Sequence, residues 1–136
     1  MSYGTYSLNR YQETSITTAS PEQLVVMMYE GAILSLKQAA TQIEMKDLMG
    51  KRHSINRATA IIQHLQGTLD KQRGGNIAED LDRIYTYVLG RILEGSIQLK
   101  PAPLHEAVKV LENLLGSWEE IARQKRPSVI SKKAIG

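Results

Sequence analysis

Cysteine is absent from the 136 residues of this chain, which excludes disulfide bonds, thiolate catalysis and cysteine-based soft-metal sites. Long apolar runs are absent as well. The longest, Leu24–Tyr29, has six residues, whereas a transmembrane helix needs roughly 20. The N-terminal segment is polar and lacks the apolar stretch of a signal peptide. We therefore expect a cytoplasmic protein with no membrane insertion.

Acidic residues are missing from the C-terminal end, where residues 123–136 hold five basic side chains. Residues 1–122 carry twelve basic and fourteen acidic residues, so the overall charge of +3 comes from this short segment alone. Basic side chains elsewhere are scattered among acidic ones, and no aromatic residues alternate with the basic tail. This distribution is not typical of a nucleic-acid-binding fold. We expect no nucleic-acid partner.

Motifs for catalysis and cofactor binding are missing too. Neither G-x-x-x-x-G-K-[ST] nor G-x-G-x-x-G occurs. The three histidines are His53, His64 and His105, and none has a glutamate three positions earlier, as a di-iron bundle requires. We therefore expect no enzyme activity, no metal site and no cofactor.

Capping residues and breaks divide the chain into four predicted helices. Ser20 and Gln23 fit a capping box at the start of the first helix. Asp47 is a good N-cap for the second helix, and Gly74-Gly75 can supply its left-handed end. Asn76 can cap the third helix. The helices are predicted over residues 21–44, 48–73, 77–99 and 103–124.

Apolar residues recur in these helices at steps of three and four, the spacing of one helix face. The fourth helix shows this stripe most clearly, with Leu104, Ala107, Leu111, Leu114, Trp118 and Ile121. Four such helices with short connections predict an all-α, antiparallel up-down four-helix bundle with an irregular N-terminal arm and a disordered basic C-terminal tail. The expected division is residues 1–19 for the arm, 20–125 for the bundle and 126–136 for the flexible tail.

The helices carry more apolar residues than one stripe each requires. The surplus includes Leu34, Tyr87, Leu93, Ile97 and Val110. For any single residue, a wide core stripe is the simpler interpretation. On the first and third helices, however, the apolar residues cover most of the circumference. An exposed apolar groove that accepts a partner helix explains the whole set better.

Four blocks of sequence carry a resemblance to a known family. They are TASPEQLVVMMYEGAI (residues 18–33), INRATAIIQHLQGTLD (55–70), GGNIAEDLDRIYTYVLGRIL (74–93) and LENLLGSWEEI (111–121). In this order and spacing they resemble the bacterial flagellar secretion chaperones, which hold flagellin before export. The resemblance runs from about residue 8 to residue 122. Asn76 replaces an expected acid and Arg57 an expected lysine, and neither change touches the apolar pattern.

The resemblance implies a bundle that binds the C-terminal segment of flagellin, which is disordered in the monomer. It also implies that the chaperone blocks polymerisation in the cytosol and helps deliver flagellin to a component of the flagellar export gate. An N-terminal arm would lie over part of the binding surface, with Leu8 and Tyr11 as its apolar and aromatic residues. A client that orders on binding needs a large apolar surface to offset its lost entropy, and the apolar surplus agrees with this.

Residues beside or outside the stripes are our candidates for partner binding. Tyrosine suits such a surface, because its hydroxyl stays hydrated while the ring contacts the partner. Trp118 lies on a stripe and is assigned to the core. For Tyr29 and Tyr85 the alternative is a position at the core edge, with the hydroxyl bonded inside the bundle. The predicted partner-binding residues are Leu8, Tyr11, Tyr29, Ile33, Ile61, Tyr85, Tyr87 and Leu89.

Two other functions stay open at this point. A dimerisation module would use the same apolar surplus on itself, and a weak homodimer is also compatible with the chaperone. Histidine phosphotransfer domains are four-helix bundles whose exposed histidine is followed by lysine and glycine. Here no lysine follows His64, and Gly67 stands one residue early. We therefore favour a hydrated helix residue at His64.

Overall fold

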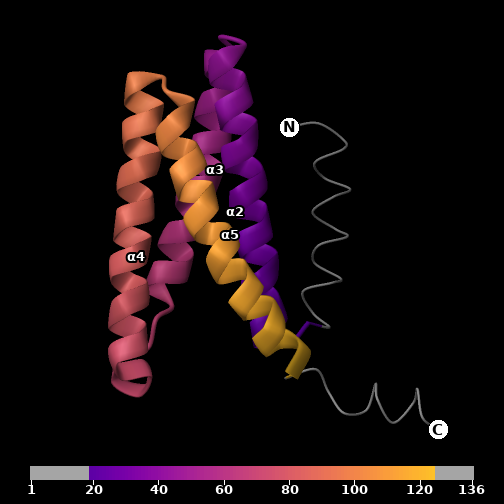
Figure 1. Ribbon diagram of the computed structural model, residues 1–136, viewed down its shortest axis with the longest axis vertical. Helices are drawn as coiled ribbons and strands as arrows, with labels where there is room; N and C mark the ends of the chain where they lie inside the picture. Colours follow the sequence, from indigo (N-terminus) through magenta and orange to yellow (C-terminus); the bar gives the residue numbers. More distant parts are fainter. Residues whose placement is uncertain (1–18, 125–136) are drawn as a thin grey trace, which may run out of the picture.

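The computed structural model describes residues 19–124, which form four α-helices joined by short turns (Figure 1). The helices are α2 (Pro21–Glu44), α3 (Leu48–Gly67), α4 (Lys71–Gln98) and α5 (Pro101–Gln124). No strand occurs within this range. The predicted disordered tail, and the predicted arm except for its last residue, lie outside the described residues.

The four helices form a closed ring. α2 packs against α3 and α5, and α4 packs against the same two helices. Consecutive helices run in opposite directions (Figure 1), so the predicted antiparallel up-down bundle is confirmed. α2 and α4 lie diagonally opposite each other, as do α3 and α5. In the described part of the chain, no helix is apolar over enough of its length to cross a bilayer.

α2 begins where the capping residues predicted. The Ser20 hydroxyl accepts a hydrogen bond from the backbone N–H of Gln23 at 3.1 Å, and the Gln23 side-chain oxygen accepts one from the backbone N–H of Ser20 at 3.0 Å. Pro21 occupies the first turn, where a missing N–H costs no hydrogen bond. The helix ends at Glu44, as expected.

The boundary between α3 and α4 differs from the prediction. α3 ends at Gly67 rather than near Arg73, and Asp70 rather than Asn76 is the N-cap of α4. The Asp70 carboxylate accepts a hydrogen bond from the backbone N–H of Arg73 at 3.2 Å, so the next helix starts earlier. Gly75 interrupts α4 with φ +53° and ψ −127°, a conformation that suits glycine. The Gly-Gly pair therefore marks a bend inside α4 instead of the end of α3.

The turn between α4 and α5 is tight. Leu99 adopts a left-handed conformation (φ +55°), and the backbone N–H of Lys100 donates to the carbonyl of Gly95 at 3.0 Å. α5 begins at Pro101, two residues before its predicted start, because proline is tolerated in a first helical turn. Gly95 is buried against α5, and a Cβ atom there would lie 2.9 Å from Leu104 Cδ2.

The core consists mainly of the predicted stripes. Burying one such side chain contributes roughly 1.5–3 kcal/mol. Two serines are buried as well, and the hydroxyl of Ser54 donates to the side-chain oxygen of Gln42 at 2.7 Å. The largest fully buried aliphatic side chains are Leu36, Ile62, Val88, Ile92, Leu104 and Leu111.

Candidate functional site

Three of the predicted partner-binding residues lie in the core. Tyr29 and Tyr85 have exposed fractions of 0% and 1%, and Ile33 is buried as well. Neighbouring helices cover these side chains, so in this conformation they offer no surface to a partner. The expectation that Tyr29, Ile33 and Tyr85 line an open groove is therefore corrected: in this conformation they are core residues. The bundle uses a wider apolar stripe on α2 and α4 than the minimum, as globular helices often do.

The other predicted residues are distributed differently. Tyr87 on α4 is 49% exposed. Ile61 and Leu89 are partly buried and pack against the core. Leu8 and Tyr11 lie outside the described residues. The structure therefore does not bring the described members of the set together at one surface, and Tyr87 is the one among them that is about half exposed.

Tyr29 and Tyr85 form a polar contact in the apolar core. Their hydroxyl oxygens lie 2.6 Å apart, and their ring centroids are separated by 6.3 Å. Trp118 of α5 lies against the ring of Tyr29, with a centroid distance of 6.4 Å. Burial, together with the hydrogen bond between the Tyr85 and Tyr29 hydroxyls, raises the pKa of the Tyr85 phenol. Both phenols are therefore neutral, and each satisfies the other's hydrogen-bonding group inside the bundle.

α4 and α5 separate along their length. In Figure 1, α5 leans away from α4 below their connecting turn and crosses α2. α5 accordingly packs more extensively on α2 than on α4. Between α4 and α5 lies a shallow hollow, lined by Ile84 and Tyr87 of α4, Val110 of α5 and the ion-paired Asp80 and Arg83. We call these five residues the α4–α5 groove.

Further apolar side chains are exposed on the outer side of α4. Leu93 is 59% exposed and Ile97 is 70% exposed. Because they are four residues apart, they lie on the same helix face. The remaining large apolar residues with high exposure are Leu34, Met45, Leu48, Met49, Ile77, Leu99 and Ile121. α4 thus offers the most apolar surface, as the sequence surplus indicated.

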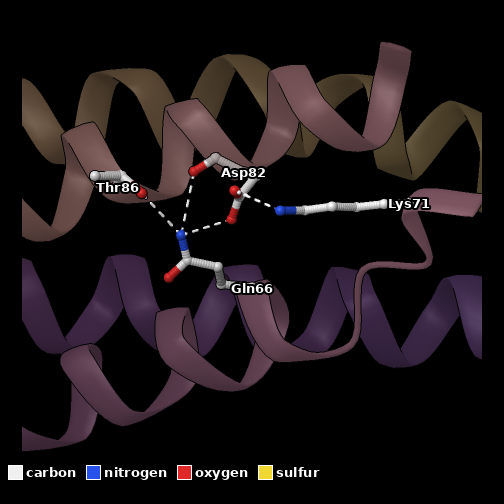
Figure 2. Close-up of polar contacts among 4 residues, drawn as sticks. All are labelled: Gln66, Lys71, Asp82 and Thr86. Atoms are coloured by element: carbon white, nitrogen blue, oxygen red, sulfur yellow. Dashed lines mark hydrogen bonds and ion pairs between the residues drawn. The ribbon is translucent and has the colours of Figure 1, made fainter. Parts of the chain in front are cut away.

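A polar cluster connects the end of α3 to α4 (Figure 2). The Gln66 side-chain amide donates to Asp82 Oδ1 and to Thr86 Oγ1, each at 2.9 Å. Lys71 Nζ donates to Asp82 Oδ2 at 3.0 Å. The hydrogen bonds from Lys71 and Gln66 lower the pKa of Asp82. Because Lys71 precedes the bend at Gly75, this ion pair folds the first turn of α4 back onto the helix.

Among residues 19–124, the histidines stand apart from one another on the surface of the bundle. His53, His64 and His105 are all exposed. Within residues 19–124, no group of three or more histidine, aspartate or glutamate side chains is placed to hold a metal ion. The apolar groove, rather than a set of polar groups, is therefore the candidate site.

Three apolar residues of the groove and of the outer side of α4 were part of the apolar surplus in the sequence but were not among the predicted partner-binding residues. They are Leu93, Ile97 and Val110. Leu93 and Ile97 lie on the side of α4 away from the buried Val88 and Ile92, a signal present in the helical spacing. Val110 joins the site for another reason. It packs against the core but stays only partly buried where α4 and α5 diverge, and the spacing within α5 does not indicate that divergence.

Comparison with known proteins gives a consistent result. The family described as "Flagellar protein FliS" matches residues 4–125 of the chain. The flagellar secretion chaperone FliS of Salmonella typhimurium is 31% identical over 111 residues, which cover 81% of this chain and 82% of that protein. The flagellar secretion chaperone FliSB of Pseudomonas aeruginosa is 30% identical over 124 residues, which cover 88% and 98%. FliS of Bacillus subtilis is 28% identical over 116 residues, which cover 85% and 86%.

Proposed function

Because the chain belongs to the FliS family of flagellar proteins, we propose that it is a secretion chaperone that binds the C-terminal segment of flagellin in the cytoplasm. Its relatives carry the name flagellar secretion chaperone, which gives the general role. In the proposal, the chaperone keeps flagellin from polymerising before export. It then helps deliver flagellin to a component of the export gate.

The exposed apolar surface of α4 is the observation that carries this proposal. A segment that is disordered alone must lose conformational entropy when it binds, and apolar burial offsets that loss. The α4–α5 groove provides an apolar floor of Ile84, Tyr87 and Val110 for an amphipathic client helix. Leu93 and Ile97 form a separate exposed apolar patch on α4, turned around the helix from Tyr87 toward the α3 side. Such a shallow, open surface favours moderate affinity, which a chaperone needs in order to release its client.

The residues proposed to contact the client follow from their exposure. Tyr87 is the central contact, with Ile61 and Leu89 as partly buried neighbours. Tyr29, Ile33 and Tyr85 would join the contact surface only if the bundle opened between α2 and α4. Leu8 and Tyr11 of the N-terminal arm are proposed to compete with the client for the apolar surface.

Titration of a flagellin C-terminal peptide into full-length variants tests the groove. We expect Tyr87→Ser to weaken binding by roughly tenfold, as truncation of a central aromatic contact commonly does. Met49→Ser is the matched control, because Met49 is exposed at the other end of the bundle, near the turn between α2 and α3. Calorimetry should show less than about a twofold change for this control. Equal affinities for Tyr87→Ser and the wild type would place the client elsewhere.

The role of the arm has its own experiment. Removing residues 1–15 should raise the affinity or the association rate for the same peptide if the arm covers the surface. Unchanged affinity together with an unchanged association rate would rule out the competition.

A self-associating bundle is the main alternative, and the exposed Leu93 and Ile97 would also suit a dimer interface. Mass measured by light scattering separates the two functions. A monomer that forms a one-to-one complex with the peptide supports the chaperone. A tight dimer that ignores the peptide supports the alternative. Phosphotransfer at His64 is tested by following labelled phosphoryl groups onto that residue.

A further inference from the structure

α3 has an unusual charge composition. Its 20 residues include Lys51, Arg52, Arg57 and two histidines, but neither aspartate nor glutamate. Each of the other three helices contains at least three acidic residues, which equal or outnumber the basic ones. α3 is therefore the cationic helix of a bundle whose other helices are neutral or negative.

The arginines of α3 also differ from the others in their partners. On α4 and α5, every arginine forms an ion pair with a carboxylate: Arg73, Arg83, Arg91 and Arg123. Arg52 and Arg57 are exposed, and neither has an ion-pair partner among residues 19–124. Lys51 differs from these two, because its ammonium donates to Ser96 of α4 at 3.2 Å. Two guanidinium groups on α3 thus remain available to a carboxylate from outside.

Arg57 lies on a line with two histidines along α3. His53 precedes it by four residues and His64 follows it by seven, so the three lie on one helix face. All three are exposed. The line spans about 16 Å at 1.5 Å per residue. A partner helix with carboxylates at the same spacing would match it along three turns.

A polar hollow lies beside this line, between α2 and α3. No carboxylate lines it, and its lining residues are Lys37, Gln38, Thr41, Gln42, Gly50, His53, Ser54 and Arg57. Gly50 is closely packed at one end, because a Cβ atom there would collide with the Asp47 carboxylate and lie 2.7 Å from the side-chain nitrogen of Gln42. Asp47 therefore borders this end, and its Oδ1 accepts the backbone N–H of Gly50 at 3.0 Å. Lys37 is paired with Glu112 of α5 at 3.2 Å.

From the free guanidinium of Arg57 and the hollow that no carboxylate lines, we infer that the α2–α3 face is a docking site for an acidic segment of a partner protein. Arg52, five residues earlier, lies on the other flank of α3 and does not line the hollow. Arginine binds carboxylates with paired, charge-assisted hydrogen bonds, and the amides of Gln38 and Gln42 can bind the peptide backbone beside them. Nucleic acid would need a denser row of basic or aromatic side chains than one free arginine among neutral amides. A membrane surface would need a continuous row of exposed apolar side chains, whereas Met49 extends the line at one end only and Ala60 follows Arg57 farther along.

The order of helices in the ring separates this face from the α4–α5 groove. The α2–α3 and α4–α5 junctions lie on opposite sides of the bundle. Both sites can therefore be occupied at the same time. The inference does not depend on the proposed client, because its evidence is the charge and pairing of α3 alone.

The test uses the full chain and a synthetic helical peptide with glutamates repeating at steps of four and three. A peptide with glutamine at the same positions is its control. We expect the glutamate peptide to shift the NMR amide signals of α3 and to bind more weakly as salt increases. Replacing the free arginine of this face, Arg57→Gln, should weaken binding by roughly tenfold. The matched control is Arg52→Gln, which removes an equally exposed and unpaired arginine from the other flank of α3 and should change binding by less than about twofold.

Several results would overturn the inference. One is equal binding by the Arg57→Gln and Arg52→Gln variants, and another is equal binding of the two peptides. Failure of the glutamate peptide to bind would also overturn it. Tighter binding of a single-stranded oligonucleotide, or of vesicles containing anionic lipid, would assign the face to another class of partner. Because both exchanged residues are exposed, we expect unchanged melting temperatures, and circular dichroism checks this for each variant.

Discussion

The hydroxyl oxygens of Tyr29 and Tyr85 lie 2.6 Å apart at the centre of the bundle and join the two diagonal helices α2 and α4. Neighbouring helices of the ring pack against each other directly. A diagonal pair meets only where long side chains reach the middle. Each hydroxyl is the hydrogen-bond partner of the other in a region without water-facing surface. Removing one hydroxyl and removing both should therefore have different consequences.

Tyr29→Phe alone should lower the free energy of unfolding by about 1–3 kcal/mol, because the Tyr85 hydroxyl would stay buried without a partner. The double variant Tyr29→Phe with Tyr85→Phe should cost less than the sum of the two single variants. Urea denaturation of the four proteins measures this coupling. Additive effects would show that the two hydroxyls act independently.

Alkaline pH should weaken the fold through the same pair. Burial is the main cause that raises the pKa of both Tyr85 and Tyr29 above the ordinary value of about 10. The unfolded chain then loses these protons at a lower pH than the folded chain. The free energy of unfolding is unaffected below about pH 10 and falls as the pH rises further. Urea denaturation between pH 8 and about 11.5 should show this decline.

The variant without either phenol is the control for this experiment. Lysines also titrate near pH 10.4 and contribute to any alkaline effect in both proteins. The double phenylalanine variant should therefore show a shallower decline than the wild type. Identical slopes for the two proteins would mean that the buried tyrosines do not cause it.

Trp118→Ala should destabilise the bundle. The indole packs against the core beside Tyr29 but is only partly buried. Its loss should cost near or below the lower end of the roughly 3–5 kcal/mol observed for buried tryptophan. Thermal melting followed by far-ultraviolet circular dichroism gives the value. An unmoved melting curve would show that the ring adds nothing to the packing of α5 on α2.

Two glycines of α4 offer a matched pair of variants. Gly95→Ala should destabilise by about 1–3 kcal/mol, because the new Cβ would stand 2.9 Å from Leu104 and 3.0 Å from the carbonyl of Lys100. Gly90→Ala should stabilise by about 0.5–1 kcal/mol, because the new methyl group meets nothing within 4 Å and alanine favours the helix. Denaturation midpoints of the two variants should move in opposite directions. A shift of both in the same direction would contradict the packing at Gly95.

Much of the fold follows from local sequence rules. The cap at Ser20 and the apolar stripe of α5 depend only on residues close in sequence, so both can be predicted from the sequence alone. The end of α3 was placed wrongly because Gly74-Gly75 is a strong helix breaker. Asp70, a few residues earlier, is a competing N-cap for the next helix, and the folded chain uses it. The ion pair of Lys71 with Asp82 then stabilises the bend at Gly75. That ion pair depends on the folded chain.

The candidate site was harder to predict. Tyr29 and Tyr85 are buried because each meets the other, 56 residues away in sequence, and a single-helix pattern carries no such information. Tyr87 was predicted to be available, and the structure exposes it. The partial exposure of Val110 depends on the divergence of α4 from α5, which is a property of the whole bundle. Spacing therefore identified the surplus of apolar residues but could not separate its buried members from its exposed ones.

The neighbouring rings of Trp118 and Tyr29 have a practical consequence. The chain has a single tryptophan, so its tryptophan emission arises at one known point where α5 meets α2. Energy passed from Tyr29 to this indole would fall if the helices moved apart. A ligand that forces the bundle open would therefore change the emission spectrum, whereas one that rests on the outside of α4 would leave it nearly constant. An ordinary fluorimeter, with no attached dye, can distinguish these two modes of capture.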